Sequence, residues 1–230
     1  RPPFEMKRLA NNVAHVKVNT MVDGEKADQL FADNFTEISK ADALILDLRE
    51  NGGGSSGIGY RILSFLTEKQ FKGSAWFTRN YRPAVRAWGQ LQEKYGREAW
   101  EVSADELKKM RGENTKVFDK PVIVLSSPRT FSAAEDFLVA FKPLKRGLVI
   151  GEPTGGSTGQ PLFFNLPGGG SARVCSKYDT FADGTAFVGI GVVPDILAKP
   201  KVSDFIEGKD SVLETALREL NLTLSILKIQ

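Results

Sequence analysis

Two segments of the sequence contain residue types that could take part in nucleophilic catalysis, one as the source of a nucleophile and the other as a site for an anion. The first, Arg129–Glu135, places Ser132 at the predicted start of a helix, where the helix dipole and free N–H groups favour a developing negative charge. The second, Asn51–Gly54, contains a glycine triplet that can present backbone N–H groups to an anion. Each segment also has a structural explanation, because Ser132 and Glu135 fit a Ser-x-x-Glu capping box and a glycine triplet fits a tight turn.

His15 is the only histidine, and therefore the only imidazole available as a general base near neutral pH. It lies in a predicted strand, whose alternation puts it on the same face as Lys17 and Asn19. A histidine that is merely packed and hydrogen-bonded in a half-buried strand fits the pattern equally well. The single cysteine, Cys175, excludes an internal disulfide and, with one histidine, leaves no Cys/His metal cluster.

Short apolar runs, which predict strands, alternate along the chain with helical periodicities, which predict helices. These elements must position the candidate residues. The predicted strands are Val13–Val18, Ala43–Arg49, Pro121–Leu125 and Gly147–Ile150, and the predicted helices are Asp28–Lys40, Ile58–Leu66, Ser132–Phe141 and one around residues 212–220. A hairpin is expected from Leu162–Leu166 and Ala172–Ser176. This order is typical of an α/β fold, in which sites collect where strands end, so the glycine loop and the serine loop should converge.

Residues 70–118 differ from the rest, because charged residues and all three tryptophans interleave there without a clear strand period. We interpret the segment as an insertion with helices at Arg82–Tyr95 and Ser103–Arg111, the second opened by the capping pair Ser103 and Glu106. No internal repeat or low-complexity linker divides the chain. Residues 1–230 are therefore expected to form one domain that carries this insertion.

Composition excludes several classes of protein. The 230 residues are 41% hydrophobic and 26% charged, values that argue against a disordered, collagen-like or coiled-coil protein. The net charge of +3 is spread along the chain without a dense basic block, so nucleic acid is not an expected partner. No apolar run approaches the roughly 18 residues that a membrane span needs.

Four motifs occur in the order found in one known family. They are Leu44–Gly54, Thr130–Glu135, Gly151–Gly156 and Gly189–Asp195. Together they resemble the tail-specific or C-terminal-processing serine peptidases, with their relatives the tricorn core peptidases and the interphotoreceptor retinoid-binding modules. The resemblance implies that Ser132 is the nucleophile. It also implies an oxyanion hole formed by the N–H groups of Gly53 or Gly54 and of Ala133.

The chain departs from the family where the general base is expected. In the processing peptidases a lysine follows the nucleophile by 25 positions, but that position here is Ser157, which excludes a serine–lysine dyad at this place. The tricorn-like branch takes a histidine from the first strand and a glutamate from the position of Val188. An ungapped comparison puts that histidine position at Lys17, two residues after His15.

We therefore expect His15 to be the base for Ser132, with Lys17 as the alternative after a bulge or register shift. His15 should then lie within about 2.6 to 3.2 Å of the serine oxygen, or close to that range. A lysine base would instead need burial to lower its pKa. Ser157 or Thr158, from the facing loop, would serve as an orienting hydroxyl.

The resemblance implies a ClpP/crotonase-like spiral core and a peptidase that hydrolyses protein or peptide substrates through an acyl-enzyme at Ser132. It implies no metal or organic cofactor, and it implies export or membrane tethering, which are common in the family. The insertion is expected to form a lid or groove wall. The family often carries a PDZ module, for which this chain has no separate segment of adequate length. The sequence carries no signal for the oligomeric state.

Two other functions remain open from the sequence. The retinoid-binding relatives resemble this core without depending on peptidase chemistry, so the chain could be a catalytically inactive module that binds an apolar ligand or peptide. Inertness toward serine-directed probes would select that alternative. A crotonase-type acyl-CoA enzyme, which shares the implied spiral and N–H oxyanion hole, is a third hypothesis, and bound acyl-CoA would identify it.

Overall fold

A six-stranded sheet forms the centre of the computed structural model, which describes residues 1–78 and 99–227. In spatial order the strands are β1 (Phe4–Leu9), β2 (Val13–Val18), β3 (Ala43–Asp47), β7 (Val122–Ser126), β8 (Leu148–Gly151) and β12 (Ile196–Leu197). β1 runs antiparallel to β2, and the other neighbouring pairs are parallel. The four strands expected from apolar runs are confirmed, whereas the edge strands β1 and β12 were not foreseen.

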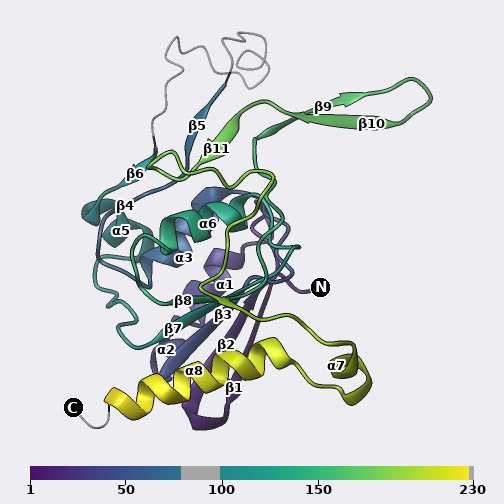
Figure 1. The fold of residues 1–230 in the computed structure, drawn as a ribbon. Coiled ribbons are helices and arrows are strands. Elements are labelled where there is room, and N and C mark those ends of the chain that lie inside the picture. The colour runs from purple at the N-terminus through teal and green to yellow at the C-terminus, as the bar shows by residue number, and fades with distance from the viewer. Residues whose placement is uncertain (79–98, 228–230) are drawn as a thin grey trace.

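Helices cover both faces of the sheet (Figure 1). One face packs against α1 (Ala27–Asp33), α2 (Phe35–Ser39), α3 (Ser56–Ser64) and α6 (Ala133–Phe141), which share a core with alternate residues of β2 and β3. The other face packs against α8 (Ser211–Leu227) alone among the helices of the described chain, through Val212, Ala216 and Leu220. Because strand residues alternate between faces, each side chain in β2 and β3 points toward one of these two faces.

The helix expected at residues 28–40 is two helices, because α1 ends at Asn34. The Asn34 side chain donates to the carbonyl of Leu30 at 2.9 Å, a local bond that competes with regular helix geometry. At the other end of the chain, α8 is longer than the helix expected around residues 212–220, since it extends to Leu227. The break after α1 arises from a side-chain contact, which apolar periodicity does not report.

The segment 70–118 forms three short strands and a helix, and one of these strands pairs with a strand outside the segment. β4 (Phe71–Lys72) pairs with β6 (Glu101–Val102), and β5 (Ala75–Phe77) pairs with β11 (Tyr178–Thr180). The expected helix is present as α5 (Ala104–Arg111), and Ser103 and Glu106 cap each other as predicted. The helix expected at Arg82–Tyr95 lies outside the described residues.

The expected hairpin is present as β9 (Pro161–Asn165) and β10 (Ser171–Cys175), and it extends away from the body (Figure 1). A short helix, α7 (Val202–Glu207), follows β12 and precedes α8. None of the described helices is long and apolar enough to span a membrane. The α/β fold expected from the sequence is therefore observed, with the glycine loop and the serine loop both following strands of the central sheet.

Candidate active site

Ser132 lies immediately before α6, at the end of a turn that follows β7. Thr130 fixes this turn, because its hydroxyl donates to the carbonyl of Leu48 at 2.9 Å and accepts the N–H of Ser127 at 3.0 Å. Ser132 has a φ of +53°, in a region that residues other than glycine rarely adopt. Such strain persists only where surrounding contacts hold the backbone, and it is concentrated at functional sites.

Glu135 supplies those contacts from the first turn of α6. Its side chain is fully buried and accepts the N–H of Ser132 at 3.0 Å, which is the glutamate half of the predicted capping box. It also accepts the Thr154 hydroxyl at 2.5 Å and the N–H groups of Gly156 and Ser157 at 2.7 and 2.9 Å. Burial raises the pKa of Glu135, and these bonds only partly offset that effect. Glu135 thus joins the nucleophile turn to the loop after β8.

The glycine loop after β3 lies directly against Ser132. A Cβ atom on Gly53 would fall 2.6 Å from Ser132 Cβ and 3.1 Å from the amide nitrogen of Ala133. A Cβ atom on Gly54 would fall 2.0 Å from the carbonyl oxygen of Met21, and Gly54 has a φ of +140°. Close approach on both sides therefore requires glycine at these two positions. The convergence of the two loops, expected from the order of strands, is observed.

The amides of Gly53 and Gly54 differ in their hydrogen bonds. Gly53 donates its N–H to the Asn51 side chain at 2.9 Å, and its carbonyl accepts the N–H of Met21. In extended backbone, successive residues direct their amides to opposite sides, so the Gly54 N–H points away from Met21. Within the described residues, the Gly54 and Ala133 amides have no hydrogen-bond acceptor. Of the two glycines proposed from the sequence, Gly54 therefore has the amide that is free to accept a ligand oxygen as its partner, whereas the Gly53 amide is already bonded to Asn51.

The loop that contains Ser157 and Thr158 contacts the nucleophile turn, although through its backbone. The carbonyl of Ser157 accepts the N–H of Ser132 at 3.2 Å. Thr158 donates its hydroxyl to Asp179, whose other carboxylate oxygen accepts the ammonium group of Lys177 at 2.7 Å. The two residues are therefore close to the turn as expected, but the Thr158 hydroxyl orients Asp179.

A second buried carboxylate, Asp136, lies beside Glu135 in α6. It accepts the hydroxyls of Ser56 at 2.6 Å and Ser74 at 2.5 Å, which tie α6 to the start of α3 and to the chain before β5. Burial raises the pKa of Asp136, and the negative charge of Asp179 adds to this effect. The nucleophile helix is thus held by polar contacts on several sides.

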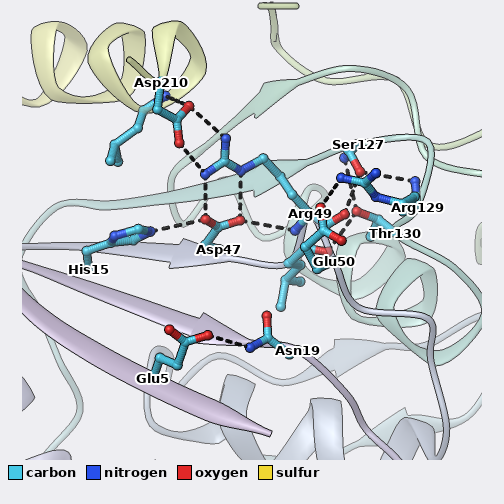
Figure 2. Close-up of polar contacts among 12 residues, drawn as sticks. Glu5, His15, Asn19, Asp47, Arg49, Glu50, Ser127, Arg129, Thr130 and Asp210 are labelled. Carbon is cyan, nitrogen blue, oxygen red and sulfur yellow. Dashed lines mark hydrogen bonds and ion pairs between the residues drawn. The ribbon is translucent and has the colours of Figure 1, made fainter. Parts of the chain in front are cut away.

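His15 and Lys17, the candidate bases, lie on the face of the sheet opposite to α6. His15 pairs with Ile45, which belongs to the core against α8, whereas its neighbours Ala14 and Val16 belong to the core that contains α6. Figure 2 shows the His15 ring directed at Asp47, with Nε2 3.1 Å from the carboxylate. The expectation that His15 approaches Ser132 is wrong, because strand alternation separates them by the thickness of the sheet.

Lys17 shares that face, and it lines a cavity of about 830 Å³ together with Asp47 and Arg49. No register shift or bulge interrupts the pairing of β2 with β3, since Val13–Lys17 align residue by residue with Ala43–Asp47. The irregularity that would have turned Lys17 toward Ser132 is therefore absent from this strand pair.

Asp47, Arg49 and Asp210 form a clamp that attaches the start of α8 to the sheet (Figure 2). Arg49 donates to both oxygens of Asp47 and to both oxygens of Asp210, at 2.7 to 2.9 Å. Asp210 also accepts the N–H of Leu213 at 3.0 Å, as a helix cap. Burial would raise the pKa of Asp47, but hydrogen bonds from His15 and Arg49 hold it well below its usual range. His15 is thus part of a structural network.

Replacing Asp210 with asparagine should lower the free energy of unfolding by about 1 kcal/mol at pH 7, because the cap is kept and the partly exposed ion pair is lost. Burial would raise the pKa of Asp210, but hydrogen bonds from Arg49 and Leu213 lower it below the ordinary value of 3.8. The stability that the ion pair contributes is therefore lost as the pH falls through this lowered pKa. Urea denaturation at pH 7 and pH 3 measures it. The control Asp23→Asn, at an exposed site, should leave the free energy of unfolding unchanged at both pH values. An equal loss of stability in Asp210→Asn at pH 7 and pH 3 would contradict the ion-pair explanation.

Sequence reasoning missed the residues that join loops to one another. Asn51 was included only as the start of the glycine loop, yet its side chain donates to the carbonyl of Val18 and accepts the N–H of Gly53. Asp136, Asp179 and Lys177 carried no motif signal, because their partners are distant in the sequence. For Glu135, the capping box was a usable signal, although it showed only one of the four contacts.

Comparison with known proteins supports the motif-based assignment. The model of peptidase family S41 matches residues 12–198. Carboxyl-terminal-processing peptidase 2, chloroplastic, of Arabidopsis thaliana is 30% identical over 158 residues, covering 68% of this chain and 26% of that protein. The solved structure of mature CPAF complexed with lactacystin superposes with a TM-score of 0.70 at 17% identity, covering 99% and 55% of the two chains.

The structure of the photosystem II D1 C-terminal processing protease gives a TM-score of 0.59 at 22% identity, covering 87% of this chain and 49% of that one. These two structural matches show that the α/β fold is shared. The chain spans about a quarter of the length of the Arabidopsis relative and about half the length of the two solved chains.

Proposed function

Because this chain belongs to peptidase family S41, we propose that it is a serine peptidase that cleaves protein or peptide substrates at Ser132. The observation that carries the proposal is a pair of amides, Gly54 and Ala133, that have no acceptor in the described part of the chain and lie beside a serine with a positive φ. Backbone N–H groups placed beforehand stabilise the oxyanion of a tetrahedral intermediate, and each such donor contributes roughly 3 kcal/mol in known oxyanion holes. The N-terminus of α6 adds its dipole to the same point.

In the proposed reaction the Ser132 hydroxyl attacks the scissile carbonyl, and the carbonyl oxygen takes the negative charge toward Gly54 and Ala133. Collapse of this intermediate expels the amine and leaves an acyl-enzyme, which water then hydrolyses. The serine proton requires an acceptor other than His15 or Lys17, since both lie across the sheet. Export from the cytoplasm, or tethering to a membrane, stays a proposal based on the family.

The opposite placement of His15 and Lys17 favours one alternative, a peptidase-like module that binds an apolar ligand or peptide without cleaving it. A serine hydroxyl with no nearby base is a poor nucleophile at neutral pH. The same buried network around Glu135 would then preserve the shape of a groove and not a reaction centre.

A fluorophosphonate probe separates the two functions. We expect a covalent adduct on Ser132, mapped by mass spectrometry, and no adduct in Ser132→Ala. His15→Gln, which keeps a donor toward Asp47, and Lys17→Ala should be labelled at rates within about twofold of the parent, because neither side chain faces Ser132. A folded parent that is never labelled between pH 5 and 10 would support the binding module. Loss of labelling in His15→Gln alone, with the fold intact, would restore His15 as the base.

A further inference from the structure

The hairpin of β9 and β10 is an exposed ribbon with no buried residue in either strand. It extends beyond the sheet and helices of the body (Figure 1). Isolated two-stranded hairpins are marginally stable at best in water, and contiguous exposed apolar surface marks interaction sites. The side chains on this ribbon therefore indicate what it contacts.

Cross-strand register sorts these side chains onto two faces with different chemistry. Phe164 pairs with Ala172 and Leu162 pairs with Val174, so these four residues, here called the apolar hairpin face, lie together. Phe164 is 48% exposed and Val174 is 54% exposed. The opposite face of the hairpin mixes apolar and polar side chains. It contains the remaining pairs, Phe163 with Arg173, Asn165 with Ser171 and Pro161 with Cys175.

The base of the hairpin is attached to the candidate active site. Ser157, whose carbonyl accepts the N–H of Ser132, precedes β9 by only a few residues. The returning strand is held to the same loop, because the N–H groups of Ser176 and Lys177 donate to the carbonyl of Gly159 at 2.9 and 3.3 Å. The base of the hairpin and the nucleophile turn are therefore held by the same loop.

Exposed aromatic surface continues at this base. Tyr178, at the start of β11, packs against Phe77 of β5 with ring centroids 5.1 Å apart, and Phe77 is 41% exposed. Trp76, next to Phe77, lies 5.8 Å from the ammonium group of Lys177. Aromatic side chains are therefore also found on β11, which follows the returning strand β10, and on its partner β5.

We propose that the apolar hairpin face is a docking surface for an extended, apolar segment of the polypeptide substrate, upstream or downstream of the bond presented to Ser132. This inference rests on the proposed function and deepens it. The alternation of side chains on a strand lets an extended peptide place every second residue against this face, and the outer edges of β9 and β10 offer backbone partners. Residues 161–175 contain Arg173 and no acidic residue, so the preferred segment is neutral or acidic.

The adjacent phenylalanines give a matched pair of variants for a binding test. In the Ser132→Ala protein, Phe164→Ser and Val174→Ser together alter the apolar hairpin face, whereas Phe163→Ser replaces one phenylalanine on the opposite face. The probe is a fluorescein-labelled peptide of about 12 residues alternating leucine with serine, long enough to run along β9 and reach Ser132. Anisotropy should show a Kd raised at least about tenfold by the double variant and less than about twofold by Phe163→Ser.

Two controls make the outcomes decisive. All substituted side chains are exposed, so the variants should fold, which circular dichroism checks. The proposal would be overturned if the double variant and Phe163→Ser raised the Kd equally, or if neither raised it. It would also be overturned if only the double variant converted a dimer to a monomer, because a second copy of the chain would then cover the apolar hairpin face. The same hairpin variants with Ser132 intact should keep the parent's fluorophosphonate labelling rate. If no protein is labelled but the double variant still weakens peptide binding, docking is supported and the peptidase proposal fails.

Discussion

Substitution of Gly54 by alanine should reduce the rate of fluorophosphonate labelling at Ser132 by about 100-fold or more, the effect of removing one oxyanion donor in known enzymes. The new Cβ atom would fall 2.0 Å from the carbonyl oxygen of Met21, and a φ of +140° strains any residue other than glycine. The loop must therefore move, and its N–H moves with it. Gly53→Ala should act similarly, because its Cβ would meet Ser132 Cβ at 2.6 Å.

The third glycine of the triplet supplies the control for this experiment. A Cβ atom on Gly52 would have no neighbour within 4 Å, so Gly52→Ala should keep labelling within about twofold and the free energy of unfolding within about 0.5 kcal/mol. Urea denaturation of the three variants separates a local displacement from global unfolding. Parent-like labelling of a folded Gly54→Ala protein would show that the Gly54 amide takes no part in oxyanion binding.

Removal of the Glu135 carboxylate should destabilise the protein by about 3–5 kcal/mol, the range for breaking a buried polar network. Glu135→Ala removes the acceptor of the Thr154 hydroxyl and of the Gly156 and Ser157 N–H groups, and it leaves the Ser132 N–H with only its 3.2 Å bond to the Ser157 carbonyl. Because Ser132 and Ser157 lose a shared partner, the nucleophile turn and the facing loop should also separate. Hydrogen exchange at the Gly156 and Ser157 amides should rise, and labelling of Ser132 should fall with it.

Glu113→Ala is the matched control, since Glu113 is exposed and the same atoms are removed. Its free energy of unfolding should stay within about 0.5 kcal/mol of the parent. If Glu135→Ala is as stable as Glu113→Ala, the four hydrogen bonds of Glu135 do not hold the site together. Glu135→Gln should also be destabilised, because the amide keeps one acceptor oxygen but brings an NH₂ group toward N–H donors.

The α/β fold was predictable because its central strands are buried on both faces. Such strands read as continuous apolar runs, as in Ala43–Asp47 and Val122–Ser126, and the residues after them read as loops. Motif order then identified the family, since four short segments in sequence are far more specific than any one of them. The edge strands β1 and β12 escaped prediction because pairing at one edge imposes a weaker pattern on the residues.

The candidate base illustrates what the sequence could not decide. Strand periodicity correctly put His15 and Lys17 on one face of β2, but it could not say which face α6 would cover. That choice depends on the helices packed against each side of the sheet: α6 shares a core with Ala14 and Val16, and α8 packs with Val13 and Ile45. The side chain of His15 consequently meets Asp47, and the ring takes part in attaching α8.

By itself, the sequence determined the family, the nucleophile candidate Ser132 and the two loops that meet around it, because each is encoded in residues adjacent along the chain. Only the tertiary structure decided which glycine amide is already bonded, which face of the sheet His15 occupies, and that Glu135 joins two loops. Those properties depend on the directions of N–H groups and side chains relative to distant segments. Local periodicity fixes such directions only within one element, and packing sets them between elements.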